Sequence, residues 1–348
     1  MSAMPPLRVL VVDDSPTVRA VLRRILGRSP DMVVVAEAGD GAQAVELVLR
    51  HQPDVVLMDV EMPVLDGFAA TERIMAVRPT PIVVVTSRAN RDEVRTAFEA
   101  VRRGAVEVLP KPGEPAGWEH LSQTLPTIVR VAAGARARSV PPASATLVAP
   151  ADLDLRRGVR YVAVGASTGG PQAVHELLSA LPADPPATVL VVQHIASGFE
   201  EGFADWLAKD LQRDVRLAVD GELAAPATVR ISPGGVHLRL LKDGTLRLDA
   251  ETAPHGGHRP SADELFASCA ASCPRQVAGV LLSGMGRDGA QGLAALRQAG
   301  GWTMVQDEPS SVVFGMPKAA LEIGAASISL SPRELGRLLA RCWQGDCR

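Results

Sequence analysis

Short apolar runs alternate with helical patterns along most of the chain, and this alternation constrains the fold more than any other feature of the sequence. Each run has the length and the β-branched residues of a buried strand, and each is followed by apolar residues at helical spacing. Strands that alternate with helices form parallel sheets whose two faces are covered by the helices. The sequence therefore predicts an α/β protein. The strands expected in the first half are residues 7–12, 33–36, 55–58, 82–85 and 106–109.

The same alternation returns after residue 160, so we expect a second doubly wound, mainly parallel sheet. Within it, residues 236–241 and 246–248 flank an Asp-Gly pair, which is a signal for an antiparallel hairpin. The length of 348 residues agrees with about two domains. The fold class predicted from the sequence is therefore α/β, with two doubly wound domains and one inserted antiparallel hairpin.

Composition narrows the classes of function. The net charge of −3 gives no domain-wide basic excess, so we expect no nucleic-acid partner. No apolar stretch reaches the roughly 18–20 residues that a membrane span needs, so we expect a protein that is not embedded in a membrane. The four cysteines match no zinc-site spacing and are expected to be reduced thiols. These features together predict a cytoplasmic location.

The boundary between the two halves has its own composition. A helical pattern over residues 118–133 contains Pro126, which predicts a break or a kink in that helix. Residues 134–158 are rich in Ala, Pro and Arg, as is typical of an exposed linker. We therefore expect a first domain over residues 1–133 and a second over residues 159–348.

Polar residues follow four of the first five strands. Asp13 and Asp14 come after the first strand, Asp59 after the third, Thr86 after the fourth and Lys111 after the fifth. Because parallel strands place their carboxyl ends at one edge of the sheet, these side chains should share a crevice. Three carboxylates repel one another unless a cation joins them, and oxygen ligands suit Mg²⁺. A carboxylate beside Mg²⁺ and a lysine is suited to attack a phosphoryl group.

Residues 7–113 resemble the receiver domain of two-component response regulators. The resemblance rests on the acid pair, on VLMDVEMPVLDG around the third strand, on VTS after the fourth and on LPKP after the fifth. It implies a flavodoxin-like fold in which Asp59 accepts a phosphoryl group, Thr86 is the switch hydroxyl and Lys111 contacts the phosphate. The Mg²⁺ ligands that it implies are Asp13, Asp14, Asp59 and the backbone carbonyl of Glu61.

The second half opens with YVAVGASTGGP, in which a predicted strand meets a glycine-rich turn that carries Ser167. Gly165 and Gly169 flank this serine and permit a tight strand-to-helix turn. A serine on such a turn lies beside the free N–H groups of a helix N-terminus. The position suits a nucleophile or an anion site, although a capping serine in a polar loop gives the same pattern.

Three polar residues follow predicted strands of the second half: Ser167, His194 and Asp288. Acyl transfer needs this combination, because a base must take the proton of the serine and an acid must orient the base. The chain order differs from that of α/β-hydrolases, in which the acid precedes the histidine, so the ordinary lipase fold is not favoured. Position alone does not select one of the seven histidines, but His194 is favoured because it follows a buried strand.

A competing pattern lies in the same half. The loop Gly284–Gly289 fits G-x-G-x-x-G between a strand and a helix, and Asp307 follows about 20 residues later. This is the dinucleotide-binding fingerprint, so a receiver-linked oxidoreductase is the alternative hypothesis. Against it, these glycines lie in the last third of the domain, and the motifs around Ser167 and His194 are left without a role.

Residues 159–345 resemble the catalytic domain of chemotaxis protein-glutamate methylesterases. The motifs that carry the resemblance are VGASTGGP, VVQHI, ISPGGVHL, HRPSADELFAS, LLSGMGRDGAQG and QDEPSSVVFGMPKAA. It implies a Rossmann-like domain in which Ser167 is the nucleophile, His194 the base and Asp288 the orienting acid. Thr168 and Met285 would line the site and are candidate backbone donors to an oxyanion.

This resemblance also implies the function. The protein would be a phosphorylation-activated esterase that hydrolyses glutamate methyl esters on methyl-accepting chemoreceptors to glutamate and methanol, in chemosensory adaptation. Deamidation of receptor glutamines is a second implied activity. A chemotaxis histidine kinase would be the phosphodonor. Mg²⁺ is the cofactor expected in the receiver domain, and none is expected for the esterase.

Overall fold

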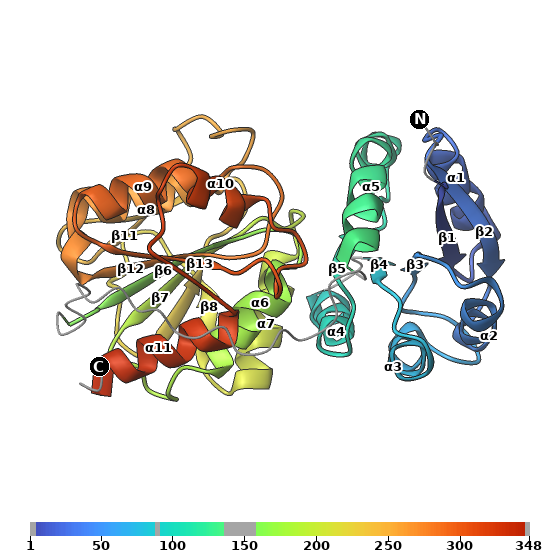
Figure 1. Cartoon of the computed structure of the whole chain (residues 1–348), viewed down its shortest axis with the longest axis horizontal. Helices are drawn as coiled ribbons and strands as arrows, with labels where there is room; N and C mark the ends of the chain where they lie inside the picture. Colours follow the sequence, from blue (N-terminus) through green and yellow to red (C-terminus); the bar gives the residue numbers. More distant parts are fainter. Residues whose placement is uncertain (1–4, 88–90, 136–157, 345–348) are drawn as a thin grey trace. The chain divides into compact units, whose positions relative to one another are not determined.

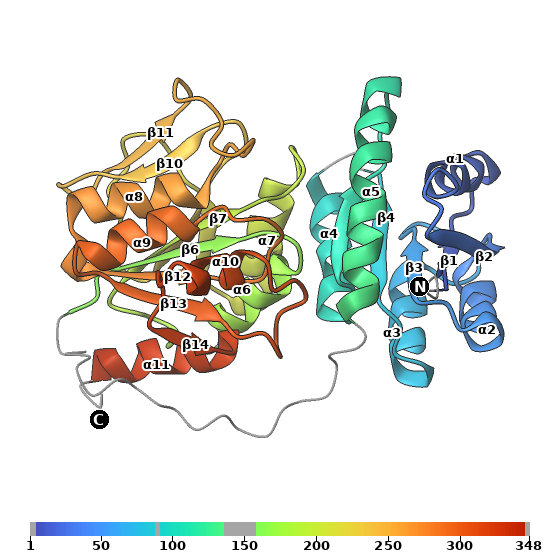
Figure 2. The same ribbon diagram turned by 45° about the horizontal axis from the view of Figure 1, so that its top comes forward.

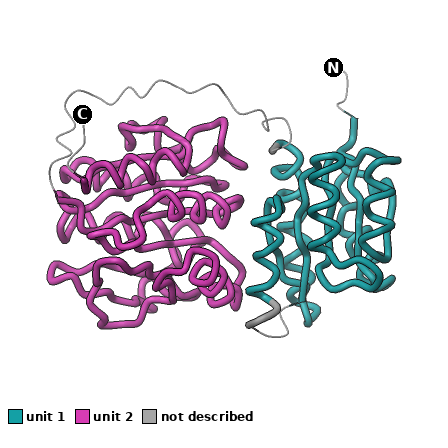
Figure 3. Tube along the Cα trace, turned by 90° about the horizontal axis from the view of Figure 1, so that it is seen from below, with its two compact units in different colours: residues 1–140 teal, residues 141–348 magenta. Residues whose placement is uncertain are grey.

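The computed structural model describes residues 5–87, 91–135 and 158–344. The chain divides into two compact units, residues 1–140 and 141–348, coloured teal and magenta in Figure 3. Most of the expected linker, residues 136–157, lies outside the described residues. Among the described residues, no helix has both the length and the apolar character that crossing a lipid bilayer requires.

The first unit is one sheet of five parallel strands between two layers of helices. Its elements are β1 (Leu7–Val12), α1 (Pro16–Leu26), β2 (Met32–Ala38), α2 (Gly41–His51), β3 (Val55–Met58), α3 (Gly67–Val77), β4 (Ile82–Thr86), α4 (Arg91–Arg102), β5 (Glu107–Pro110) and α5 (Pro115–Ala135). The strand order is β2-β1-β3-β4-β5, and every pairing is parallel. Helices α1 and α5 cover one face, and α2, α3 and α4 cover the other (Figure 1). The strand order reverses between β1 and β3, which is where ligand sites form in such sheets.

The second unit is a larger sheet of the same kind. Its elements are β6 (Tyr161–Ala166), α6 (Gly170–Ser179), β7 (Thr188–Gln193), α7 (Glu200–Leu211), β8 (Asp214–Leu217), β9 (Thr228–Ile231), β10 (His237–Leu240), β11 (Leu246–Asp249), α8 (Ala262–Ser272), β12 (Val277–Leu281), α9 (Ala290–Gln298), β13 (Trp302–Gln306), α10 (Met316–Glu322), β14 (Ile328–Leu330) and α11 (Pro332–Gln344). Seven parallel strands lie in the order β14-β13-β12-β6-β7-β9-β8. Helices α8, α9 and α10 cover one face, and α6, α7 and α11 cover the other (Figure 1).

The predicted antiparallel hairpin is confirmed as a separate two-stranded sheet of β10 and β11. At its turn, the Asp243 carboxylate accepts a hydrogen bond from the N–H of Thr245 at 2.9 Å. Strand β10 packs on α8, as Figure 2 shows, and the N–H of Leu240 donates to the hydroxyl of Ser268 at 3.0 Å. The predicted fold class, α/β with two mainly parallel sheets, is therefore confirmed.

The central strands are largely apolar because both faces of each sheet are covered. Every residue of β6, β7 and β12 is buried. If polar and apolar residues alternated along these strands, the polar side chains of one face would be buried against helices. Strands of parallel sheets therefore appear in the sequence as continuous apolar runs. These three strands lie side by side in the centre of the second sheet and provide a rigid support for the loops at their carboxyl ends.

Two local features differ from the sequence expectation. Helix α5 runs through Pro126 without a break in its assigned range. Leu125, Val129 and Ala132 are fully buried in the core of the first unit, so tertiary packing outweighs the backbone hydrogen bond that Pro126 cannot donate. Strand β14 was not expected, since three residues at the edge of a sheet are too few to show a period.

Candidate active site

Ser167, His194 and Asp288 follow strands that end at the same edge of the second sheet. Strand β6 lies between β7 and β12, and all three run in the same direction. Ala166 pairs with Gln193 at the ends of β6 and β7, so Ser167 and His194 leave neighbouring strands at the same level. The loop after β12 brings Asp288 to the same edge. The carboxyl ends of these parallel strands therefore converge on one site, as the sequence predicts.

The turn that carries Ser167 requires glycine for steric reasons. Gly169 has a φ of +73°, which favours glycine. A Cβ on Gly170 would lie 2.1 Å from the side-chain oxygen of Gln193, which excludes any larger residue without movement. The N–H of Ser167 donates to the carbonyl of Ser283 at 2.9 Å, which ties the turn to the loop after β12. The Ser167 hydroxyl is half-buried and forms no hydrogen bond within the described part of the chain.

The Asp288 carboxylate is held at the N-terminus of α8. Oδ1 accepts from the Ser261 hydroxyl at 2.6 Å and from the N–H of Asp263 at 3.2 Å, and Oδ2 accepts from the N–H of Ala262 at 2.7 Å. Burial raises the pKa of Asp288, but the hydrogen bonds from His194, Ser261 and Ala262 outweigh it and hold that pKa below its usual value. The carboxyl group is therefore ionised at neutral pH.

His194 is placed between the acid and the serine loop. Its Nε2 lies 2.9 Å from Oδ2 of Asp288. Its Nδ1 is buried and has no hydrogen-bond partner among the described residues. An unpaired buried nitrogen is costly unless a ligand or a reacting group uses it. A general base needs one nitrogen on the acid and the other free to take a proton, and catalytic hydrogen bonds are often long in the absence of substrate.

Two backbone N–H groups near Ser167 are available to a substrate. Neither Thr168 nor Met285 donates its backbone N–H to an acceptor in the described residues. Thr168 follows Ser167 directly, and Met285 follows Gly284, where an added Cβ would lie 2.8 Å from the Cβ of Ser167. Unpaired N–H groups beside a nucleophile are suited to stabilise an oxyanion.

Sequence reasoning overlooked Gln193. This side chain is buried, and its Nε2 donates to the carbonyl of Ser167 at 2.8 Å and to the carbonyl of His194 at 2.9 Å. One amide therefore joins the backbones that carry the proposed nucleophile and base. The Gln-His pair in VVQHI was the available signal, because a polar residue at the end of a buried strand needs a partner.

Two other polar residues of the matching motifs lie in structural positions. His237 is fully buried, and its Nε2 is 3.2 Å from the carbonyl of Ala253. Arg259 donates to the carbonyls of Ala250 and Thr252 at 2.9 and 3.3 Å. Both side chains contact backbone carbonyls, so they support the local structure around the hairpin and the loop that follows it.

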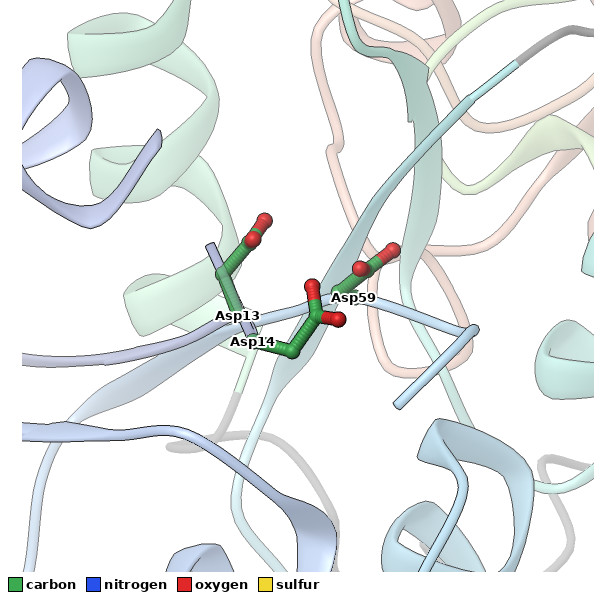
Figure 4. A group of neighbouring side chains, drawn as sticks. All are labelled: Asp13, Asp14 and Asp59. Carbon is green, nitrogen blue, oxygen red and sulfur yellow. The ribbon is translucent and has the colours of Figure 1, made fainter. Parts of the chain in front are cut away.

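The first unit holds a second cluster of functional side chains. Asp13 and Asp14 follow β1, and Asp59 follows β3; one carboxylate oxygen from each lies within 4.8 Å of the others (Figure 4). Asp13 and Asp59 are buried, and Asp14 is exposed. The Nζ atom of Lys111 is 2.7 Å from Oδ2 of Asp13 and 2.6 Å from Oδ2 of Asp59. The N–H of the same lysine donates to the carbonyl of Thr86 at 2.7 Å.

Burial dominates the electrostatics of Asp59. Burial raises the pKa of Asp59 to about 6, and the charge of Asp13 adds to this effect, while Lys111 opposes it. Three acidic oxygens in one crevice fit a hard divalent cation, which would offset their repulsion. Glu61, whose backbone carbonyl is the fourth expected ligand, is exposed in the loop two residues after Asp59.

Comparison with known proteins identifies both units. A family model described as CheB methylesterase matches residues 162–339, and one described as response regulator receiver domain matches residues 9–120. The chain is 46% identical over 338 residues to protein-glutamate methylesterase/protein-glutamine glutaminase 3 of Anaeromyxobacter dehalogenans, covering 96% of this chain and 98% of that protein. It is 41% identical over 347 residues to protein-glutamate methylesterase/protein-glutamine glutaminase 2 of Methanospirillum hungatei, and this match covers 96% of this chain and 97% of that protein.

A solved structure agrees with the assignment of the second unit. The crystal structure of the Thermotoga maritima CheB methylesterase catalytic domain matches with a TM-score of 0.50 and 34% identity, and the match covers 52% of this chain and 97% of that chain. The oxidoreductase alternative finds no support, because the loop Gly284–Gly289 lies within the methylesterase match and directs Asp288 to His194. The chain therefore belongs to the CheB methylesterase family of hydrolases and carries a response-regulator receiver domain ahead of the methylesterase domain.

Proposed function

We propose that this protein hydrolyses glutamate methyl esters on chemoreceptors to glutamate and methanol, and that phosphorylation of its receiver domain activates the reaction. The receiver domain is assigned to residues 1–133, the linker to 134–158 and the catalytic domain to 159–348. The observation that supports the proposal is the contact of His194 with Asp288, whose Oδ2 lies 2.9 Å from Nε2, at the strand end beside the one that carries Ser167.

In the proposed reaction, the Ser167 hydroxyl attacks the ester carbonyl carbon of the glutamyl side chain while Nδ1 of His194 takes its proton. The ionised Asp288 stabilises the imidazolium, and the N–H groups of Thr168 and Met285 hydrogen-bond to the oxyanion. The tetrahedral intermediate then collapses, and the bond between the carbonyl carbon and the methoxy oxygen breaks. The methoxy oxygen receives the proton from His194 and leaves as methanol. An ester between Ser167 and the glutamyl group remains.

Water completes the cycle. His194 removes a proton from the water as its oxygen attacks the acyl-enzyme carbonyl, and the collapse of the second tetrahedral species returns that proton to the Ser167 oxygen. The products are the glutamate side chain and the free serine. The same steps with ammonia as the leaving group convert a glutamine side chain to glutamate, so we propose receptor deamidation as a second activity of the site.

For the receiver domain we propose that a chemotaxis histidine kinase donates a phosphoryl group to Asp59. Asp13, Asp14, Asp59 and the backbone carbonyl of Glu61 would hold Mg²⁺, which supplies positive charge for the incoming phosphoryl oxygens. Lys111 adds a second positive charge in contact with Asp59. The hydroxyl of Thr86 would then respond to the phosphoryl group as the switch residue.

The direct test is methanol release from a membrane preparation of methylated chemoreceptors, with the full chain and a small-molecule phosphodonor. Ser167→Ala should lower the rate at least about a thousandfold, because no other group in the site replaces the nucleophile. The Ser167→Ala protein should still accept a phosphoryl group on Asp59, which controls for correct folding. Methanol release by the Ser167→Ala protein at the wild-type rate would refute the assignment.

A further inference from the structure

A four-residue turn, His255–His258, lies against the proposed catalytic residues and has no role in the mechanism above. The N–H of His255 donates to the carbonyl of His258 at 3.0 Å, and the reverse bond is 2.9 Å. Gly256 and Gly257 have φ values of +57° and +89°, which a tight two-residue hairpin loop requires. Two residues paired in this way project their side chains to the same face of the hairpin.

The imidazole of His258 stacks on the imidazole of His194. The ring centroids are 3.9 Å apart, and the ring planes differ by 3°. The rings are parallel and in contact, so one face of the proposed base is covered by a second ring. The stacking fixes the plane of the His194 ring, whose Nε2 lies 2.9 Å from Oδ2 of Asp288.

The other histidine of the turn anchors it to α8. Nε2 of His255 is 3.3 Å from Oδ2 of Asp263, and Nδ1 is 3.6 Å from Oε1 of Glu264. Both acids lie in the first turn of α8, whose backbone N–H groups also hold Asp288. The turn therefore connects the element that fixes the acid to the ring that covers the base.

We propose that His258 is a positioning residue for ester hydrolysis, in which its ring forms an aromatic wall that holds the ring of His194 in the orientation that places Nε2 on Asp288. The inference rests on the proposed function, because it concerns the same reaction at the same site. The wall acts through His194 and needs no contact with the substrate.

The charges around His258 favour its uncharged form. The groups that face it are His194 and Asp288, and its partner in the turn, His255, is bound by Asp263 and Glu264. Burial lowers the pKa of His258, and positive charge on His194 lowers it further, while Asp288 acts in the opposite direction. A neutral wall suits a base that becomes an imidazolium during each acyl transfer, since a second cation in contact would oppose that charge.

The test compares His258→Ala and His258→Phe in the full-length protein, with kcat and KM for methanol release as readouts. His258→Ala should lower kcat about tenfold or more and leave KM within about twofold, because the transition state loses an aligned base. His258→Phe should restore kcat to within about threefold of the wild type.

A matched control is His175→Phe. His175 also stacks on an aromatic ring, that of Trp206, at a centroid distance of 5.2 Å, but it lies on α6 away from the strand ends. Its replacement should leave kcat within about twofold of the wild type. Where His258→Ala does not fold, as judged by circular dichroism, His258→Leu takes its place and should reproduce the loss of kcat with an unchanged KM.

Two results would overturn the proposal. An unchanged kcat in the folded His258→Ala or His258→Leu protein would show that the ring positions nothing. A His258→Phe protein as slow as His258→Ala would show that the nitrogens of His258, and not its ring face, are needed. Ser167→Ala in the same assay distinguishes failure of the proposed function from failure of this inference. If Ser167→Ala keeps methanol release, the proposed function fails. If Ser167→Ala is inactive but the His258 variants behave as wild type, only the inference about His258 fails.

Discussion

At the scale of single residues, the site depends on contacts that fix backbone positions as much as on the reacting groups. Gln193 illustrates this, because its amide bridges the carbonyls of Ser167 and His194. The same side chain lies close against Gly170, so the turn, the strand end and the amide fit together as one unit. A substitution that keeps the volume and removes the donors isolates the contribution of these hydrogen bonds.

We therefore expect Gln193→Met to lower kcat for methanol release about tenfold and the free energy of unfolding of the second unit by about 1–3 kcal/mol. The reason is that the carbonyl of His194 loses its donor, whereas the carbonyl of Ser167 still accepts from the N–H of Gly170 at 2.7 Å. Urea unfolding and steady-state kinetics measure both effects. Gln172→Met, which removes an exposed contact to Glu176, is the control and should change neither quantity noticeably. Equal kcat values and equal free energies of unfolding in the two variants would contradict the role of the Gln193 amide as a bridge between the two backbones.

The buried carboxyl of Asp59 gives a prediction about pH. Its pKa in the folded protein is about 6, above the value of about 3.9 expected in an unfolded chain. The folded state therefore keeps a proton on Asp59 between about pH 4 and pH 6 that the unfolded state has released, so stability is lost as pH rises through this window. Above pH 6 the charged carboxyl lowers the stability of the first unit.

Asp59→Asn removes this penalty. Its free energy of unfolding should exceed that of the wild type by about 1–3 kcal/mol at pH 7.5, and the difference should disappear at pH 4. Urea unfolding without divalent cations, fitted to one transition for each unit, measures it. Glu46→Gln, which neutralises an exposed carboxylate on α2, should show no such pH-dependent gain. A gain that is the same at both pH values would exclude desolvation of Asp59 as its cause.

At the scale of helices and strands, the glycine turn before α6 is the element that sets the position of Ser167. Gly170→Ala should lower the free energy of unfolding of the second unit by about 1–3 kcal/mol and reduce kcat, because its Cβ meets the Gln193 side chain. Gly134→Ala in α5 is the matched control, since an added Cβ there meets nothing within 4 Å. Thermal unfolding measures the change in stability, and methanol release measures the change in kcat. Wild-type stability and kcat in Gly170→Ala would contradict the prediction, since they would mean that the turn accommodates the Cβ.

The strand ends also explain how much of the site could be predicted from the sequence. Asp13, Asp59, Ser167 and His194 each follow a buried apolar run, and parallel strands bring such residues to one edge whatever the details of packing. What the sequence could not show is which side chains meet across that edge. The stacking of His258 on His194 depends on the path of a long loop, and no periodic pattern encodes it.

Local patterns failed where tertiary packing decides the outcome. The proline in the middle of α5 predicted a break or a kink; the helix does not break, because the buried residues on both sides of the proline maintain it. Strand β14 exists because β13 offers an edge with which Ile328–Leu330 can pair, and three residues carry too little pattern to reveal it. The glycine-rich loop before α9 matched a cofactor motif because tight turns before helices use the same residues for many purposes.

At the scale of the whole molecule, the chain joins two units that each have their own apolar core. The acidic cluster lies in one unit and the serine, histidine and aspartate in the other. Chemistry at Asp59 can therefore influence hydrolysis only through a change in how the two units act on each other, which is a coupling between distinct sites. This coupling is the central claim of the proposed function.

The most direct test is the rate of methanol release from methylated receptors by the full chain in the presence of Mg²⁺, with and without a phosphodonor. The phosphodonor should raise the wild-type rate at least about tenfold, leave Asp59→Asn unchanged and have no effect on the inactive Ser167→Ala protein. An equal increase in the wild type and in Asp59→Asn, or no increase in the wild type while Asp59 becomes phosphorylated, would contradict the claim that this residue controls the esterase.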